Sequence, residues 1–152
     1  MATIPTLTHS KNDSLQVEAV LTSPLPGSAD IFTVVDHCAM FVCVLVECEE
    51  IYYRHALCGR LSHALTLLSQ RCEEDLPDYL IGQLTAEAIP VSSVPDCWQD
   101  TCTLLAHAKA LTLALSSNTL MEKNSKELAE LLHDIVYLLV DQLKTPFILE
   151  SS

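Results

Sequence analysis

The sequence predicts an all-α protein, a bundle of about five helices. Apolar residues recur every three or four positions in several segments, which is the spacing of one helix face. No segment shows the alternation of apolar and polar residues that is typical of a half-buried strand. Turn-forming residues divide the chain into segments with short connections, and short connections favour antiparallel neighbours. At 152 residues, the chain has the size of one domain.

The chain is strongly acidic. It carries 8 Lys and Arg against 20 Asp and Glu, a net charge of −12 at pH 7. A protein that binds the phosphate backbone needs a basic surface, so this balance argues against direct binding of nucleic acid. The chain has only three Gly, and it lacks the glycine-rich loops that hold phosphate groups in nucleotide enzymes.

Residues 1–30 are expected to form a flexible N-terminal tail. Prolines and a glycine stand there among small polar residues, a composition typical of a linker. One short helix is predicted at residues 15–21, because Asp13 and Gln16 resemble a capping pair and a proline follows the apolar run. The first residues show no basic stretch followed by an apolar run, so no secretory signal is expected.

The helical bundle domain is expected to span residues 31–145. A start signal at Thr33 predicts a helix from about Val34. The apolar residues that follow cover nearly the whole circumference, so this helix is expected at the centre of the bundle. A cleaner apolar face follows between residues 57 and 72. Gly59 either separates two helices or lies inside one, and the sequence leaves both open.

Two further helices are expected before the last loop. Asp75 is the predicted cap of a short third helix. The prolines of residues 89–95 make that stretch an extended connection. Ser93 and Asp96 form a capping pair for the fourth helix, which ends near Ser116.

The fifth helix has the most regular apolar pattern. Asn124 and Glu127 form its predicted capping pair, and a broad leucine stripe continues to Leu143. Residues 146–152 begin with a proline and are expected to be a C-terminal tail. The two halves of the bundle share a plan, a long apolar helix followed by a leucine-striped one, which suggests two packed helical hairpins.

Seven cysteines in a chain without an export signal favour reduced thiols and a cytoplasmic location. Two runs of possible metal ligands recur at intervals of five residues: Cys38, Cys43 and Cys48, and Cys97, Cys102 and His107. Five residues rotate a helix position by about 140°, so these side chains point in different directions. We therefore expect no metal site and no other cofactor.

No enzyme activity is expected. A thiol or hydroxyl nucleophile needs a nearby His and an orienting acid. His133 and Asp134 are adjacent in sequence, but neighbouring helical residues point about 100° apart, so they are not expected to act as a pair. Glu130 and Asp134 share one helix face, which is more typical of a solvated surface than of acid–base chemistry. A metal-binding protein or an uncharacterised enzyme remains an alternative to the interaction protein and the mimic of nucleic acid described below.

The sequence holds more apolar side chains than one bundle is expected to bury. Its charged fraction of 18% is low for a soluble domain, while leucine is abundant. A contiguous exposed apolar patch marks an interaction site. The expected contact residues for a partner fall off the main helical stripes or in loops and tails: Leu67, Leu113, Leu120, Met121, Tyr137, Phe147 and Ile148.

These observations predict a small acidic interaction protein, a regulator or antagonist. It is expected to occupy the surface of a partner protein, such as a transcriptional regulator, or to form a homodimer through leucine-rich helix faces. Carboxylates gather within residues 47–50, 73–78 and 130–141, so the alternative is an inhibitor that mimics nucleic acid. The longest uncharged apolar run, residues 39–46, is too short to cross a bilayer, and no membrane partner is expected.

Residues 88–143 resemble short bacterial helical-hairpin proteins of unknown function. The resemblance is carried by the stretch IPVSSVPDCWQDTCTLLAHAKALTLAL, followed after a short loop by ELAELLHDIVYLLVDQL. It implies a small cytoplasmic regulator or accessory protein. No catalytic residue carries over from it.

Overall fold

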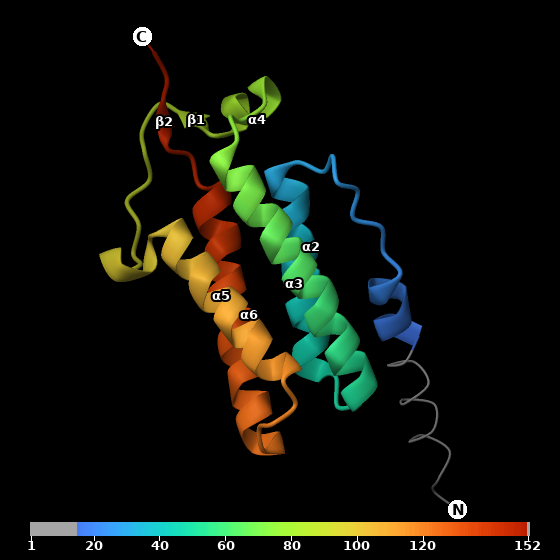
Figure 1. Ribbon diagram of the computed structural model, residues 1–152. Coiled ribbons are helices and arrows are strands. Elements are labelled where there is room, and N and C mark those ends of the chain that lie inside the picture. Colours follow the sequence, from blue (N-terminus) through green and yellow to red (C-terminus); the bar gives the residue numbers. More distant parts are fainter. Residues whose placement is uncertain (1–14, 152) are drawn as a thin grey trace, which may run out of the picture.

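The chain forms a four-helix bundle with two additional short helices in the part that the structure describes. This computed structural model describes residues 15–151, apart from the side chain of Cys97. The bundle helices are α2 (Ile31–Glu47), α3 (Ile51–Glu73), α5 (Thr101–Ser116) and α6 (Glu122–Lys144). Each contacts two others, in the closed order α2, α3, α5, α6, and consecutive helices run antiparallel (Figure 1). The predicted all-α bundle is therefore confirmed.

The remaining elements lie at one end of the bundle or along its side. The short helix α4 (Asp78–Gln83) follows α3, and a 3-10 turn, η1 (Asp96–Trp98), precedes α5. Strands β1 (Thr85–Ala86) and β2 (Ile148–Leu149) pair in parallel. They tie the chain after α4 to the chain after α6, so part of the expected C-terminal tail is held against the bundle (Figure 1).

The boundary between the first two bundle helices lies at residues 48–50, whereas the sequence offered Gly59 as the possible boundary. The first helix begins three residues earlier than predicted, because Asp30 is its N-cap and its carboxylate accepts a hydrogen bond of 2.8 Å from the Thr33 amide. It ends before Cys48, whose backbone is extended. Glu50 then caps α3 through the Tyr53 amide. Gly59 lies inside α3, so it separates no helices.

Three predicted capping signals are wrong. The predicted cap Asp75 lies outside α4, whose N-cap is Pro77. Asp96 is the first residue of the 3-10 turn and Ser93 lies before it, so this pair does not cap α5. Asp100 caps α5 by accepting a hydrogen bond of 3.1 Å from the Thr103 amide. The fifth predicted helix starts at Glu122, before its predicted cap Asn124, so that residue lies within the first turn.

Residues 15–30 pack along the α2 and α3 side of the bundle (Figure 1). Residues 15–21 are helical as predicted, and Val17 and Val20 are buried in the core. The Tyr53 hydroxyl donates a hydrogen bond of 3.0 Å to Glu18. This part of the predicted flexible tail is therefore docked, whereas the predicted capping residue Asp13 lies outside the described residues.

The core runs the length of the bundle. All four long helices contribute fully buried side chains, among them Phe41, Leu57, Leu61, Leu65, Leu68, Leu104, Leu132 and Leu139. α2 has eight buried residues, but it packs mainly against α3 and α6, just as each of the other bundle helices packs against two neighbours, so the predicted position at the centre of the bundle is wrong. No helix among residues 15–151 is long and apolar enough to cross a membrane.

Candidate functional site

The expected contact residues do not form one surface. Leu113 is 73% exposed near the end of α5, and Leu120 and Met121 lie in the following turn. Phe147 lies beyond α6, at the opposite end of the bundle (Figure 1). Met121 and Phe147 are exposed, and Leu120 is only partly so. The residues therefore divide between the two ends of the molecule.

The other three expected contact residues have different surroundings. Leu67 is only 8% exposed, because α3 packs against α2 and α5 and its buried face is wider than one leucine stripe. It is therefore not available as a surface contact. Ile148 is partly buried in β2. Tyr137 lies midway along α6, where its hydroxyl is hydrogen bonded to Cys43.

A groove of about 920 Å³ lies at the end of the bundle where α3 and α6 finish and α5 begins. The connection of residues 84–100 forms its outer wall, and the C-terminal segment after α6 forms another. Its apolar lining comes from these segments together: Leu76, Leu84, Ile89, Val91, Val94, Trp98, Leu138, Leu143, Pro146 and Phe147. This volume is within the range of about 300–1,000 Å³ that is typical of ligand sites.

Four large apolar side chains of the groove remain accessible to solvent. Val91 is 97% exposed, Phe147 60%, Ile89 40% and Trp98 37%. Sequence reasoning proposed only Phe147. The signal for Val91 was its place between two prolines, because an apolar residue in an extended stretch has no helix face on which to be buried. Trp98 was the only tryptophan of the chain and stood beside that stretch.

The segments that build the groove are rich in carboxylates. Residues 71–102 and 138–150 contain nine Asp and Glu but only two basic residues, Arg71 and Lys144. Both basic side chains are already paired. Lys144 Nζ lies 2.6 Å from Asp36, and Arg71 Nη1 lies 2.9 Å from Glu74. Of the charged residues that line the groove, Glu74 and Asp141 are acidic and Arg71 and Lys144 are basic, so the excess of carboxylates belongs to the segments that build it.

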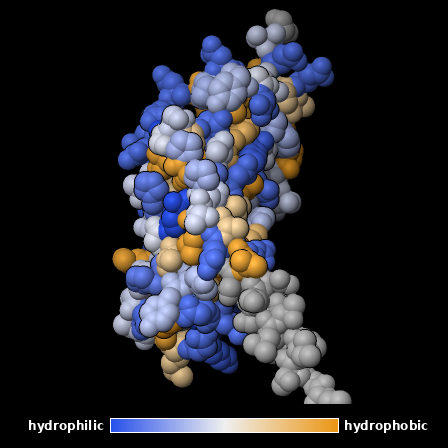
Figure 2. All heavy atoms as spheres, turned by 90° about the vertical axis from the view of Figure 1, so that its right-hand side faces the viewer, coloured by the Kyte–Doolittle hydropathy of each residue, from blue (hydrophilic) through white to orange (hydrophobic). Residues whose placement is uncertain are grey.

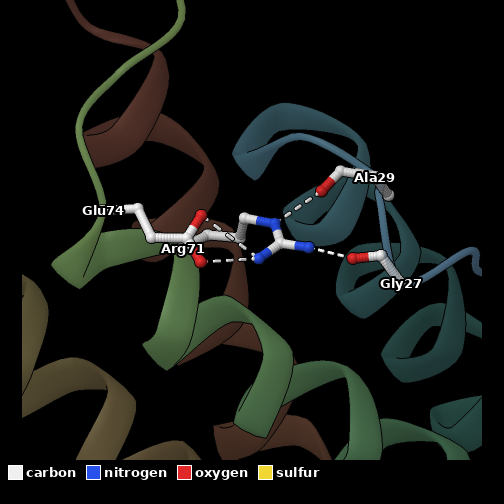
Figure 3. Close-up of polar contacts among 4 residues, drawn as sticks. All are labelled: Gly27, Ala29, Arg71 and Glu74. Atoms are coloured by element: carbon white, nitrogen blue, oxygen red, sulfur yellow. Dashed lines mark hydrogen bonds and ion pairs between the residues drawn. The ribbon is translucent and has the colours of Figure 1, made fainter.

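Arg71 connects the end of α3 to the segment before α2. Its Nε donates a hydrogen bond of 2.7 Å to the Ala29 carbonyl, and Nη2 donates to the Gly27 carbonyl (Figure 3). Its side chain is mostly buried, and it lines both the groove and a neighbouring cavity of about 270 Å³. The fork of the guanidinium therefore bonds two carbonyls of one loop, an arrangement that a lysine does not reproduce.

Asp30 follows the Ala29 carbonyl that Arg71 binds, and its carboxylate accepts one hydrogen bond from a hydroxyl and one from a backbone amide. The Tyr79 hydroxyl donates at 2.6 Å and the Thr33 amide at 2.8 Å. The bond from Tyr79 is the main cause that lowers the pKa of Asp30 below its usual 3.8, and the Thr33 amide adds to it. The same bond raises the pKa of Tyr79.

The lowered pKa of Asp30 predicts a pH-dependent contribution to stability. We expect the free energy of unfolding of the wild type to exceed that of Asp30→Asn by a constant amount well above pH 3.8. The difference should shrink as the pH falls past 3.8 and vanish below the folded-state pKa, because protonation removes the charge-assisted bonds. Urea unfolding between pH 7 and pH 2.5 measures it. A difference that stays constant across this range would contradict the assignment.

Cys43, His133 and Tyr137 meet where α2 packs on α6. Cys43 Sγ lies 2.8 Å from the Tyr137 hydroxyl and 3.9 Å from His133 Nε2. The rings of His133 and Tyr137 stack, with centroids 4.4 Å apart. His133 Nδ1 lies 3.2 Å from Asp134 Oδ1, so the two side chains touch although they are neighbours on a helix. Adjacent side chains diverge at Cβ, but the His ring and the carboxylate are long enough to meet.

The possible metal ligands are dispersed. Cys38 is buried, and burial raises the pKa of its thiol to about 12. Cys43 faces α6, and Cys48 follows the end of α2. Among the described residues, no group of three or more His, Cys, Asp and Glu is placed to hold a metal ion.

The surface over residues 15–30 carries no single large apolar area. Figure 2 shows that side of the molecule, where hydrophobic residues appear as small groups between hydrophilic ones.

Comparison with protein-family models, with curated proteins and with solved structures gave no match.

Proposed function

We propose that this chain is a non-catalytic binding protein that holds an apolar, basic segment of a partner protein in the groove at the α4 end of the bundle. The observation that carries the proposal is the groove itself, about 920 Å³ with exposed apolar walls and built from segments rich in carboxylates. By holding the partner segment in its groove, the chain would keep that segment from other contacts. It would thus act as a regulator or antagonist, and binding would need no cofactor and no covalent chemistry.

The apolar anchors give the groove its expected affinity. Aromatic side chains at the centre of a partly desolvated site dominate most protein interfaces, and Trp98 and Phe147 both line the groove. Val91, almost fully exposed, adds apolar area on the outer wall. Burying one such side chain contributes about 1.5–3 kcal/mol, so these anchors supply a large part of the free energy that offsets the costs of association.

The charge of the segments that build the groove selects the partner. The segments around it carry nine carboxylates, and both of their basic side chains are engaged within the chain. An acidic segment would be repelled, whereas Lys or Arg beside the apolar anchors would be attracted and would associate faster. The favoured occupant is therefore a polypeptide segment with apolar residues flanked by basic ones.

Selection from a random peptide library tests this proposal without a known partner. Peptides displayed on phage are selected on the wild-type chain, sequenced, and titrated by fluorescence anisotropy. We expect enriched peptides to carry aromatic or aliphatic residues beside Lys or Arg. Phe147→Asp is expected to weaken their binding at least tenfold, about 1.4 kcal/mol, because it places a charge among the apolar walls.

Leu113→Asp is the matched control for that experiment. Leu113 is also exposed, but it lies eleven residues along α5 from the groove residue Cys102, about 16 Å away. It should leave peptide binding unchanged. Equal loss in both variants, or enrichment of acidic peptides, would contradict the proposal.

Two other outcomes would favour the alternatives. A dimer in sedimentation that Phe147→Asp dissociates, with no peptide enriched, would mean that a second copy of the chain fills the groove. Binding to a protein with a basic groove that weakens steeply with salt and survives Phe147→Asp would favour mimicry of nucleic acid.

A further inference from the structure

We propose that Cys43 is a reactive thiol that hydroperoxides oxidise to a sulfenic acid, with His133 and Tyr137 as its assisting groups. This site lies where α2 packs on α6, and none of its residues lines the groove. The proposal is therefore independent of the proposed binding function.

The geometry supplies each part that an activated thiol needs. His133 Nε2 lies 3.9 Å from Cys43 Sγ, within reach of the thiol proton. On the other side of the ring, Nδ1 lies 3.2 Å from Asp134, which favours the tautomer with its free lone pair toward the sulfur. The Tyr137 hydroxyl, 2.8 Å from Sγ, can donate a hydrogen bond to the thiolate.

A hydroperoxide in solution can also reach the Cys43 thiol. Cys43 and His133 are both partly exposed, and Asp134 lies in solvent. By contrast, Cys38 and Cys58 are buried, and burial raises the pKa of both thiols. Such buried thiols are poor nucleophiles because the thiolate is the reactive form.

The position of Cys43 within α2 decides the class of electrophile. Acyl transfer is usually assisted by free backbone amides that stabilise an oxyanion, but the amides near residue 43 are used inside the helix. A hydroperoxide needs no oxyanion hole and no deep cleft. It requires a thiol beside a base and a nearby proton donor for the departing oxygen, and His133 and Tyr137 both contact Cys43 Sγ.

The oxidation balances in one step. Cys43 gives its proton to His133 Nε2, and the thiolate attacks the terminal oxygen of the hydroperoxide. A sulfur–oxygen bond forms as the oxygen–oxygen bond breaks, so sulfur loses two electrons and the peroxide gains them. The departing alkoxide, or hydroxide from hydrogen peroxide, takes the proton from His133 and leaves as an alcohol or as water. The product is Cys43 sulfenic acid.

Trapping with dimedone in the presence of hydrogen peroxide tests the proposal on the full chain. Mass spectrometry gives the labelling rate of each cysteine separately, and the exposed Cys102 is the internal reference. We expect Cys43 to be labelled at least about tenfold faster than Cys102, since a positioned acid–base group contributes that much or more. His133→Gln should bring the two rates within about twofold of each other, and Tyr137→Phe should slow Cys43 severalfold.

His63→Gln is the matched control, because His63 is an exposed histidine on α3. It should leave the Cys43 rate unchanged. Circular dichroism and the Cys102 rate show whether each variant is folded. The proposal is wrong if wild-type Cys43 reacts no faster than Cys102, or if folded His133→Gln reacts at the wild-type rate.

Discussion

Phe41→Ala is expected to lower the free energy of unfolding by about 3–5 kcal/mol, the usual cost of removing a buried phenyl ring. Phe41 is fully buried on α2, the helix that packs against both α3 and α6. The cavity left by the ring would therefore open between three helices, and a gap bounded by rigid helices collapses only partly. Since a domain is typically stable by about 5–15 kcal/mol, this loss is a large fraction of the total.

Urea denaturation followed by circular dichroism measures this effect. We expect a lower midpoint with an unchanged slope, and a melting temperature lower by roughly 10 °C. Phe41→Leu is the graded control and should cost about 1–3 kcal/mol, because it keeps most of the apolar volume but loses the aromatic ring. Leu113→Ala, at an exposed site, should change stability by less than about 0.5 kcal/mol. A loss below 1 kcal/mol for Phe41→Ala would contradict the described core.

The guanidinium of Arg60 also contacts the Phe41 ring, so the ring contributes more than its buried apolar area. Its Cζ lies 5.4 Å from the centroid of the Phe41 ring, and its Nη2 donates to the Ser23 carbonyl. Removing the ring thus removes a cation–π contact of about 0.5–2 kcal/mol as well as apolar area.

Helical periodicity predicted the fold well, because it depends on local spacing. The stripe of the last helix and the proline after it fixed the end of α6 closely. The break at residues 48–50 was not predictable in the same way. It contains neither Gly nor Pro, and the decisive event is the capping of α3 by the side chain of Glu50. Glu is not among the residues preferred at an N-cap, so sequence alone does not indicate that Glu50 begins a helix.

The candidate sites were harder to predict than the helices. The groove forms from segments that are far apart in sequence, and Val91 and Phe147 lie in regions without periodicity. Cys43 and Tyr137 are 94 residues apart. Their meeting depends on the α2 and α6 contact, which closes the bundle and which no local pattern specifies. Sequence reasoning could therefore identify apolar residues outside the stripes, but not which of them share a surface.

Arg71→Met is expected to lower the free energy of unfolding by about 2–4 kcal/mol, because it leaves two loop carbonyls without their charged donor. Methionine keeps much of the apolar stem, so the loss reports on the hydrogen bonds to Gly27 and Ala29 (Figure 3). The substitution should loosen residues 15–29 before it unfolds the bundle. Residues 15–29 should exchange their amide hydrogens faster, while the buried turns of α2 and α3 keep their protection.

Two substitutions separate the loop contact from the ion pair. Glu74→Gln removes only the surface carboxylate, which is 56% exposed, and should cost less than about 1 kcal/mol. Arg71→Lys keeps the charge but loses the fork, so it should retain less than half of the stabilisation. If Glu74→Gln cost as much as Arg71→Met, the ion pair would be the source of stability. If exchange in residues 15–29 stayed at the wild-type rate in Arg71→Met, the buried valines of that segment and its bonds from Tyr53 and Arg60 would hold it in place without Arg71.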